Sequence, residues 1–217
     1  MKIYGNFFCA AALFCALISG CTGIGLTSGE KKIIDSADSR GVMRVLTIGD
    51  REDSLLLRRP CADFSSEDLE SMFTDEDSHT ARLAAQMVAT VTDPSQDGVG
   101  IAGPQVGLSR RIVAVQRFDK EGAPFEVFPN IRIVEYGDGR RTGGEGCLSI
   151  PGRRGMVERA DTVVIEYAKK ATADGSETVY SYVRDTIGGF TAVIFQHECD
   201  HLDGILYIDR LDPQSKI

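Results

Sequence analysis

The sequence predicts an α+β fold in which β-sheets pack around a buried C-terminal helix. Helical periodicity is confined to segments before residue 92 and after residue 189, and all strand-like segments except a short closing one form a block between them. The last predicted helix is apolar on both sides, which is typical of a buried helix. Strands that alternated with helices would instead indicate a parallel sheet. The 217 residues suffice for one such domain and an N-terminal appendage.

Two helices are predicted ahead of the strands. Ser66 is expected to cap a short helix to about Phe73, because Glu67 and Asp68 favour a first turn. A longer helix is predicted over residues 78–91, where apolar residues recur at helical spacing. The Asp-Pro pair that follows ends this helix.

The strands are predicted from β-branched and aromatic runs bounded by turn residues. They cover residues 112–115, 126–128, 131–134, 162–167 and 178–183, with a polar turn at 172–175 and a closing strand at 205–208.

The final helix is predicted over residues 190–202 and carries an H-E-x-x-H motif. Its spacing places His197 and His201 on one face, close enough to bind one metal ion, with Glu198 beside them. The alternative is a pair of structural histidines beside a chance glutamate. The chain has only three histidines, and two of them lie in this motif. The motif therefore indicates a metal site.

A catalytic tetrahedral site needs a third protein ligand and one open position. The residues after His201 contain no histidine or glutamate, so the ligand is expected upstream. Cys147 in the segment Glu-Gly-Cys-Leu-Ser is the leading candidate, although a lone cysteine is often a small buried apolar residue. One thiolate and two imidazoles suit iron, zinc or cobalt.

A glycine-rich segment, residues 98–105, has glycines at alternate positions. Such spacing lets another chain approach the backbone, as when a peptide adds to a strand edge. Gln105 ends the segment and could direct an amide donor at an oxyanion. A structural turn is the alternative reading of this segment.

Together these segments resemble the peptide deformylase family. Its three motifs occur here in the family's order at residues 98–105, 145–149 and 196–201, and the similarity covers about residues 43–212. Gly103 departs from the alanine usual at that position and is expected to loosen the loop.

The resemblance implies antiparallel or mixed β-sheets around the motif helix and an enzyme that is a metal-dependent hydrolase. Its substrates would be N-formylmethionyl peptides, from which it releases formate. The ion would be Fe²⁺, with Zn²⁺, Ni²⁺ or Co²⁺ as replacements, and the enzyme would be a monomer.

The resemblance also assigns roles to individual residues. Cys147, His197 and His201 would bind the metal, Glu198 would transfer protons, and Gln105 and the Leu148 N–H would stabilise the oxyanion. The remaining site residues would bind substrate or shape its pocket. They are Val99, Gly100, Glu145, Arg154, Val193 and Ile194. Within this set, Glu145 and Arg154 are expected to pair and brace the cysteine loop.

Two alternatives remain from the sequence. The same motif could serve a metallopeptidase, or the chain could be an inactive lipid-anchored metal- or peptide-binding protein. The net charge of −8 argues against a nucleic-acid partner, because no basic stripe is present to neutralise phosphates.

The N-terminus predicts export. Residues 1–20 read as a signal peptide, and the small residues before Cys21 resemble a lipobox, in which that cysteine is acylated. Residues 21–42 are expected to form a flexible tether and residues 43–217 the catalytic domain. The enzyme would then face the periplasm and touch the membrane only through its lipid. If translation starts at Met43, it would be cytoplasmic.

Overall fold

The computed structural model describes residues 23–171 and 179–212. Among these residues no helix is both long and apolar enough to cross a membrane. The helices are α1 (Ser28–Asp35), α2 (Arg51–Leu57), α3 (Ser66–Thr74), α4 (His79–Val91) and α5 (Gly189–Leu202), with 3-10 turns at Gly103–Val106 and Tyr207–Asp209. The strands are β1 (Gly100–Ala102), β2 (Ile112–Gln116), β3 (Phe125–Pro129), β4 (Arg132–Tyr136), β5 (Arg140–Cys147), β6 (Ile150–Ala160), β7 (Thr162–Lys170) and β8 (Tyr180–Gly188).

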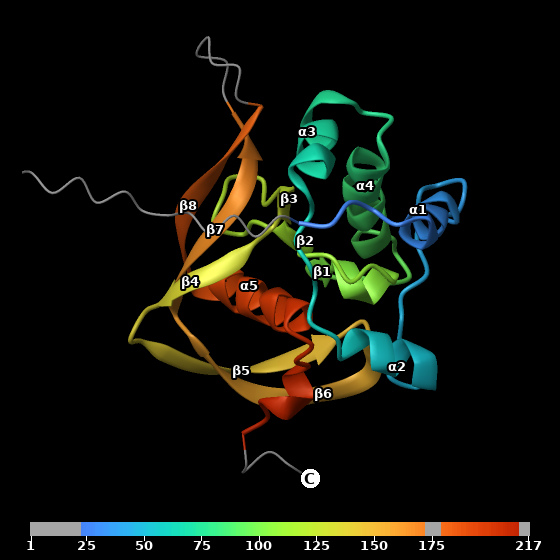
Figure 1. Ribbon diagram of the computed structural model, residues 1–217. Coiled ribbons are helices and arrows are strands. Elements are labelled where there is room, and N and C mark those ends of the chain that lie inside the picture. The colour runs from blue at the N-terminus through green and yellow to red at the C-terminus, as the bar shows by residue number, and fades with distance from the viewer. Residues whose placement is uncertain (1–22, 172–178, 213–217) are drawn as a thin grey trace, which may run out of the picture.

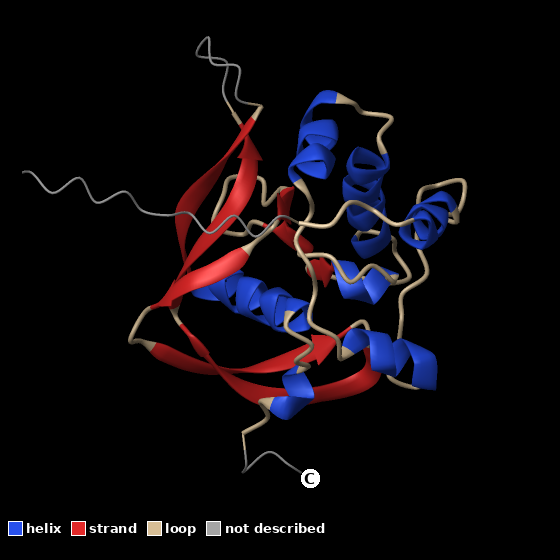
Figure 2. Ribbon diagram, in the orientation of Figure 1, coloured by secondary structure: helices blue, strands red, loops and turns tan. Residues whose placement is uncertain are grey.

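The described strands form three antiparallel sheets around helix α5. Their orders are β1-β2-β3, β4-β7-β8 and β5-β6. Helix α5 contacts strands of all three sheets, and Figure 1 shows it enclosed by them. Helices α1 to α4 gather on one side of the molecule (Figure 2), where α3 contacts β8. This arrangement confirms the predicted α+β fold.

The core forms where α5 meets the sheets. Ala192, Phe195 and Leu202 are fully buried on the helix. The Phe128 ring of β3 meets the rings of Phe195 and Tyr167 edge-on, each with 4.8 Å between centroids. Aromatic pairs favour this arrangement, which fixes the helix against two sheets.

The predicted helices match within about one residue. Ser65, not the predicted Ser66, caps α3, and Ser78 caps α4, each accepting a hydrogen bond from a backbone N–H of the first turn. Apart from the segment at 205–208, the predicted strands also occur, but strands β1, β5 and β6 and helices α1 and α2 were not predicted. The predicted turn at 172–175 lies outside the described residues.

The predicted closing strand at 205–208 is wrong. Residues Tyr207–Asp209 form a 3-10 turn instead. The Asp209 carboxylate accepts the Leu206 N–H at 2.9 Å and closes this turn locally. A side-chain bond of this kind competes with strand pairing.

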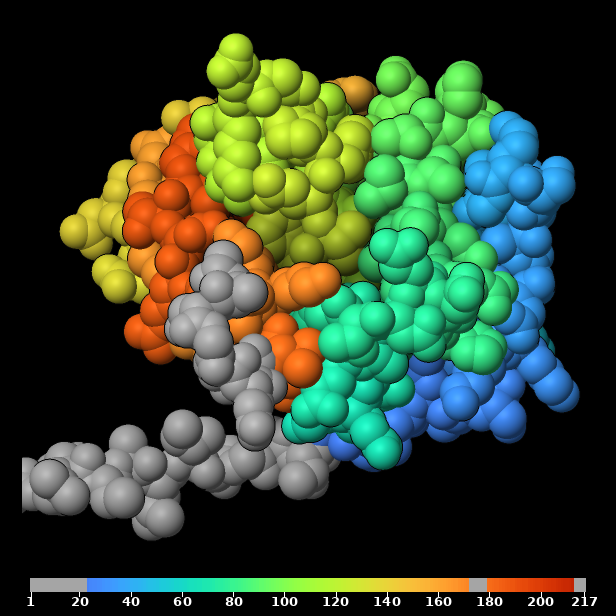
Figure 3. Space-filling view, turned by 90° about the horizontal axis from the view of Figure 1, so that it is seen from above, coloured from blue at the N-terminus to red at the C-terminus, as the bar shows by residue number. Residues whose placement is uncertain are grey.

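Much of the predicted tether is folded. Helix α1 begins with a capping box between Thr27 and Glu30, and Ile34 is fully buried. Before the helix, Ile24 forms a β-bridge with Phe64. Figure 3 shows the blue N-terminal residues against the teal surface of residues near 65–75. The folded domain therefore begins well before Met43.

Arg110 holds this N-terminal segment in place. Its side chain is only 4% exposed, and its guanidinium donates to both Glu30 carboxylate oxygens at 2.6 and 2.8 Å. It also donates to the backbone carbonyls of Ile24, Gly25 and Asp63. A buried guanidinium needs such partners, because an uncompensated buried charge is strongly destabilising. The predicted tether is therefore a structural part of the domain.

Glu30→Gln should lower the free energy of unfolding by about 3 kcal/mol, because it leaves the Arg110 charge buried without its carboxylate. Urea denaturation at pH 7 measures this loss. Glu70→Gln, at an exposed position of α3, is the matched control and should change stability by less than about 0.5 kcal/mol.

The loss should depend on pH. Burial raises the pKa of Glu30, but hydrogen bonds from Arg110 and Thr27 lower it by more. The net pKa therefore lies below the ordinary value of 4.5. A depressed carboxyl pKa stabilises the fold above the unfolded-state value, and this stabilisation is lost as the pH falls through the folded-state value. The stability difference between wild type and Glu30→Gln should therefore shrink below about pH 4.5. A constant difference from pH 7 to pH 3 would contradict this account.

Candidate active site

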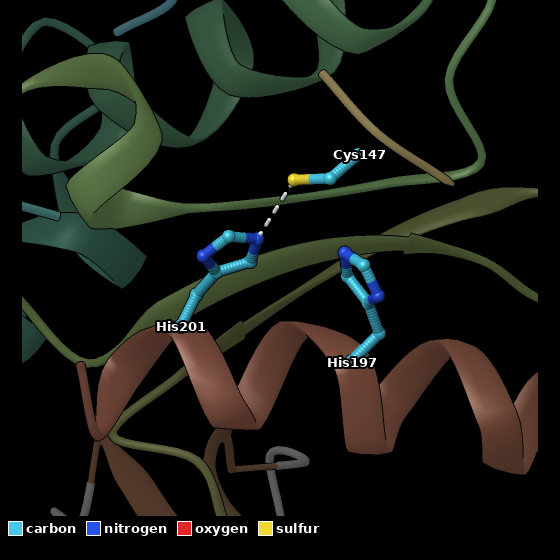
Figure 4. A group of neighbouring side chains, drawn as sticks. All are labelled: Cys147, His197 and His201. Carbon is cyan, nitrogen blue, oxygen red and sulfur yellow. Dashed lines mark hydrogen bonds between the residues drawn. The ribbon is translucent and has the colours of Figure 1, made fainter. Parts of the chain in front are cut away.

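Three potential metal ligands converge at the junction of β5 and α5. Cys147 ends β5, and His197 and His201 lie one turn apart on α5. One ligand atom from each lies within 4.8 Å of the others, and Cys147 Sγ is 3.2 Å from His201 Nε2. Figure 4 shows the three side chains directed into one space above the helix. The predicted ligands are thus brought together.

These donors fit a single divalent ion. Metal–nitrogen bonds of about 2.1 Å and metal–sulfur bonds of about 2.3 Å allow ligand atoms at these separations to share one ion. Burial leaves the pKa of His201 well below its usual range, so its ring is neutral, the form that binds metals. Burial also lowers the pKa of His197, but hydrogen bonds with Cys147 and Glu145 raise it to about 10. A metal ion bound at His197 Nε2 would displace the proton from that nitrogen.

Glu145 orients the first histidine. Its carboxylate is 2.8 Å from His197 Nδ1 and accepts two hydrogen bonds from Arg159, at 2.8 and 3.0 Å. Burial raises the pKa of Glu145, but the bonds from His197 and Arg159 lower it to about 2. An ionised carboxylate only accepts, so His197 Nδ1 carries the proton and Nε2 is left for the metal.

The predicted pair of Glu145 with Arg154 is wrong. Arg154 is exposed on β6, whereas Arg159 is buried and binds both Glu145 and Asp200. Arg210 adds two further bonds to Asp200, each 2.6 Å long. Asp200 thus holds Arg159 in place beside Glu145. Val157 and Arg159 are two residues apart and are both buried, so they share the inner face of β6, but the sequence alone does not indicate which face that is.

Glu198 lies beside the ligands, in contact with Gly100. Its side chain is 4% exposed, and its Oε2 atom has no hydrogen-bond partner among the described residues. Burial raises its pKa to about 7. A Cβ on Gly100 would lie 2.5 Å from Glu198 Oε1 and 2.9 Å from Ile194 Cγ2. Position 100 must therefore be glycine to leave room for the Glu198 carboxylate, whether or not a peptide also approaches there.

Gln105 presents its amide nitrogen to the same space. Its Oε1 accepts the Ala102 N–H at 2.8 Å, which directs Nε2 toward Cys147 Sγ at 3.5 Å. Ser149, which was not predicted as a site residue, accepts a second bond from Nε2 at 3.2 Å. The amide is thus held with its donor end toward the ligands.

Gly103 does not loosen this loop. A Cβ at this position would lie 2.6 Å from the Arg110 carbonyl oxygen and 3.0 Å from that of Leu108. The glycine instead permits a close approach of backbone to backbone.

The site opens into a cleft of about 1010 Å³. Residues 95–100 form one wall and the β5–β6 hairpin another, and α5 contributes Phe190, Val193 and Ile194. All predicted substrate-binding residues line it, although Glu145 lies buried behind His197. They are Val99, Gly100, Glu145, Arg154, Val193 and Ile194, and Leu148, which was predicted as an oxyanion donor, lines the cleft as well.

Comparison with known proteins agrees with this geometry. The family model described as polypeptide deformylase matches residues 42–216. The chain belongs to this family. It is 40% identical to the peptide deformylase of Desulforudis audaxviator over 59% of this chain and 75% of that one. It is 32% identical to that of Leptospira biflexa over 78% of this chain and 88% of that one.

Solved structures lead to the same family. The class I type b peptide deformylase of Acinetobacter baumannii with Met-Ala-Ser bound is 34% identical, with a TM-score of 0.61 over 78% of this chain and 98% of that one. As a deformylase, the chain is a metal-dependent hydrolase that removes the N-formyl group from nascent peptides. The function expected from the three motifs is confirmed.

Gly100→Ala should lower kcat/KM for formate release about 10²-fold, because the new Cβ must displace the Glu198 carboxylate. The matched control is Gly143→Ala, on the opposite wall of the cleft, where a Cβ meets nothing within 4 Å. That variant should retain wild-type activity. Equal rates for both variants would show that contact with Gly100 does not fix Glu198.

Glu145→Gln should weaken metal affinity about 10- to 100-fold, because it removes the carboxylate that orients His197. Competition for Zn²⁺ against a chromophoric chelator measures the affinity directly. Glu158→Gln, an exposed neighbour on β6, is the control and should bind Zn²⁺ like the wild type. An unchanged affinity in Glu145→Gln would reject the orienting role.

Proposed function

We propose that this deformylase hydrolyses formyl peptides with Glu198 as its proton-transfer group and Gln105 and Leu148 as its oxyanion donors. One observation carries the proposal: the buried Glu198 carboxylate and the Gln105 amide border the same space as Cys147, His197 and His201. That juxtaposition supplies a base, a donor and a metal site around one position.

Cys147, His197 and His201 would hold the ion. A bound divalent metal supplies Lewis acidity and lowers the pKa of water toward 7. Glu198 would take the proton of the attacking water and later deliver it to the departing amine. A pKa of about 7 suits both directions of transfer at neutral pH.

The oxyanion that develops on the formyl oxygen would accept hydrogen bonds from Gln105 Nε2 and the Leu148 N–H. The bond from the Ala102 N–H fixes the Gln105 amide before substrate arrives, so it needs no reorganisation during the reaction. The methionine side chain would occupy the apolar part of the cleft formed by Val99, Val193 and Ile194.

We propose Fe²⁺ as the native ion. Imidazole and thiolate donors together suit iron as well as zinc or cobalt, and the family resemblance favours iron. Metal analysis of protein purified without oxygen tests this, and zinc as the main bound metal would contradict it.

For location, we propose a lipid-anchored enzyme acylated at Cys21. The folded segment before Met43 supports a translation start upstream of that residue, because a chain begun at Met43 would lack Ile24, Gly25 and Glu30, which all bond to Arg110. The small residues ahead of Cys21 support acylation.

Glu198→Gln should lower kcat for formate release from formyl-Met-Ala-Ser by about 10²- to 10⁴-fold while one equivalent of metal stays bound. The amide keeps the shape of the side chain but cannot accept the proton. Metal content measured on the same sample separates loss of the base from loss of the ion. Wild-type turnover in this variant would reject the proposed role, and release of internal peptide fragments without formate would instead indicate a metallopeptidase.

Cys21→Ala should move the protein from the membrane fraction to the soluble fraction. Mass spectrometry of the native protein should find a diacylglyceryl modification on Cys21. An N-terminal peptide that begins at Met43 would contradict the anchor and indicate a cytoplasmic enzyme.

A further inference from the structure

The β5–β6 wall of the cleft carries three arginines. Arg141, Arg153 and Arg154 all line it. Arg141 is paired with Asp161, but in the described part of the chain neither Arg153 nor Arg154 forms an ion pair, and both are exposed. These two positive charges stand out on a chain with a net charge of −8.

The other charges of the cleft do not neutralise this wall. Asp97 is its one exposed carboxylate among the described lining residues, and it lies on the wall formed by residues 95–100. Glu145 is already paired with Arg159, and Glu198 is buried beside the metal ligands. The hairpin wall therefore presents a net positive charge to whatever lies in the cleft.

The two arginines lie close to the reaction centre. Arg154 is opposite Gly146 in the β5–β6 register, next to Cys147. An extended peptide advances about 3.4 Å per residue, so its second to fourth residues lie within about 10 Å of the formylmethionine residue. The rim near Arg153 is open, since a Cβ on Gly152 meets nothing within 4 Å.

We propose that Arg153, with Arg154 beside it, makes the cleft select formyl peptides that carry aspartate or glutamate at positions two to four. A guanidinium matches a carboxylate with two parallel hydrogen bonds, which adds geometric preference to the charge attraction. The inference rests on the deformylase activity and adds a preference in the substrate beyond the methionine. The effect should appear in KM, because the acidic substrate side chains at positions two to four take no part in breaking the formyl bond.

Two amidated peptides of equal shape test this, formyl-Met-Asp-Asp-Ala and formyl-Met-Asn-Asn-Ala. Amidation removes the C-terminal carboxylate that would otherwise bind the same arginines. The full-length, metal-loaded enzyme should show a kcat/KM about fivefold higher for the acidic peptide at low salt, in the range of exposed ion pairs. The ratio should approach one in 1 M salt, where the screening length is about 3 Å.

Variants of Arg153 test whether the preference for the acidic peptide comes from the β5–β6 wall. Arg153→Gln should reduce the ratio, and Arg153→Glu should bring it below one. Arg51→Glu, at an exposed position of α2 outside the cleft, gives the same net charge and should keep the wild-type ratio. Equal rates for the two peptides, or a ratio unchanged in Arg153→Glu, would overturn the proposal while leaving the deformylase activity intact. Absence of formate from both peptides would instead contradict the activity itself and the selectivity with it.

Discussion

The Glu145 carboxylate makes the contact on which the site depends. It lies on β5, two residues before Cys147, and it bonds to His197 on α5 and to Arg159 on β6. Because Cys147 and the histidines come from separate elements, the metal site exists only while the hairpin is held against the helix. The buried charges of Glu145 and Arg159 also stabilise each other, since removal of either would leave the other uncompensated. Geometry and stability are therefore coupled at this carboxylate.

The chemistry of α5 could be predicted because it is local. His197, Glu198 and His201 obtain their relative positions from helical spacing alone. Cys147 could be inferred as the third metal ligand because no histidine or glutamate follows His201. The partner of Glu145 could not be obtained in this way, and Arg154 was expected in place of Arg159. Which of two arginines on one strand is buried depends on the face that β6 turns toward α5, and the β5–β6 hairpin itself was not predicted. Its residues are rich in glycine and arginine and mostly exposed, so they lack the apolar alternation that marks a strand.

The N-terminal segment escaped prediction for a related reason. Its polar composition is typical of a linker, yet Glu30 finds its partner in Arg110, 80 residues later. No local pattern reveals a pairing at that separation. Gly100 shows the opposite case: alternate glycines correctly indicated a close approach, but the approaching group is the Glu198 carboxylate from the far end of the chain. The sequence thus marks where space is needed more readily than it marks what fills it.

The early start of the folded domain limits how far a lipid could hold the enzyme from a bilayer. Three residue steps separate Cys21 from Ile24, where pairing with Phe64 begins, and an extended chain covers at most about 11 Å in that interval. An enzyme acylated at Cys21 would therefore have only a short linker between its lipid and its folded domain. It would sample only the thin layer of solution next to the lipid headgroups, where its encounters are with chains that emerge at, or lie along, that surface.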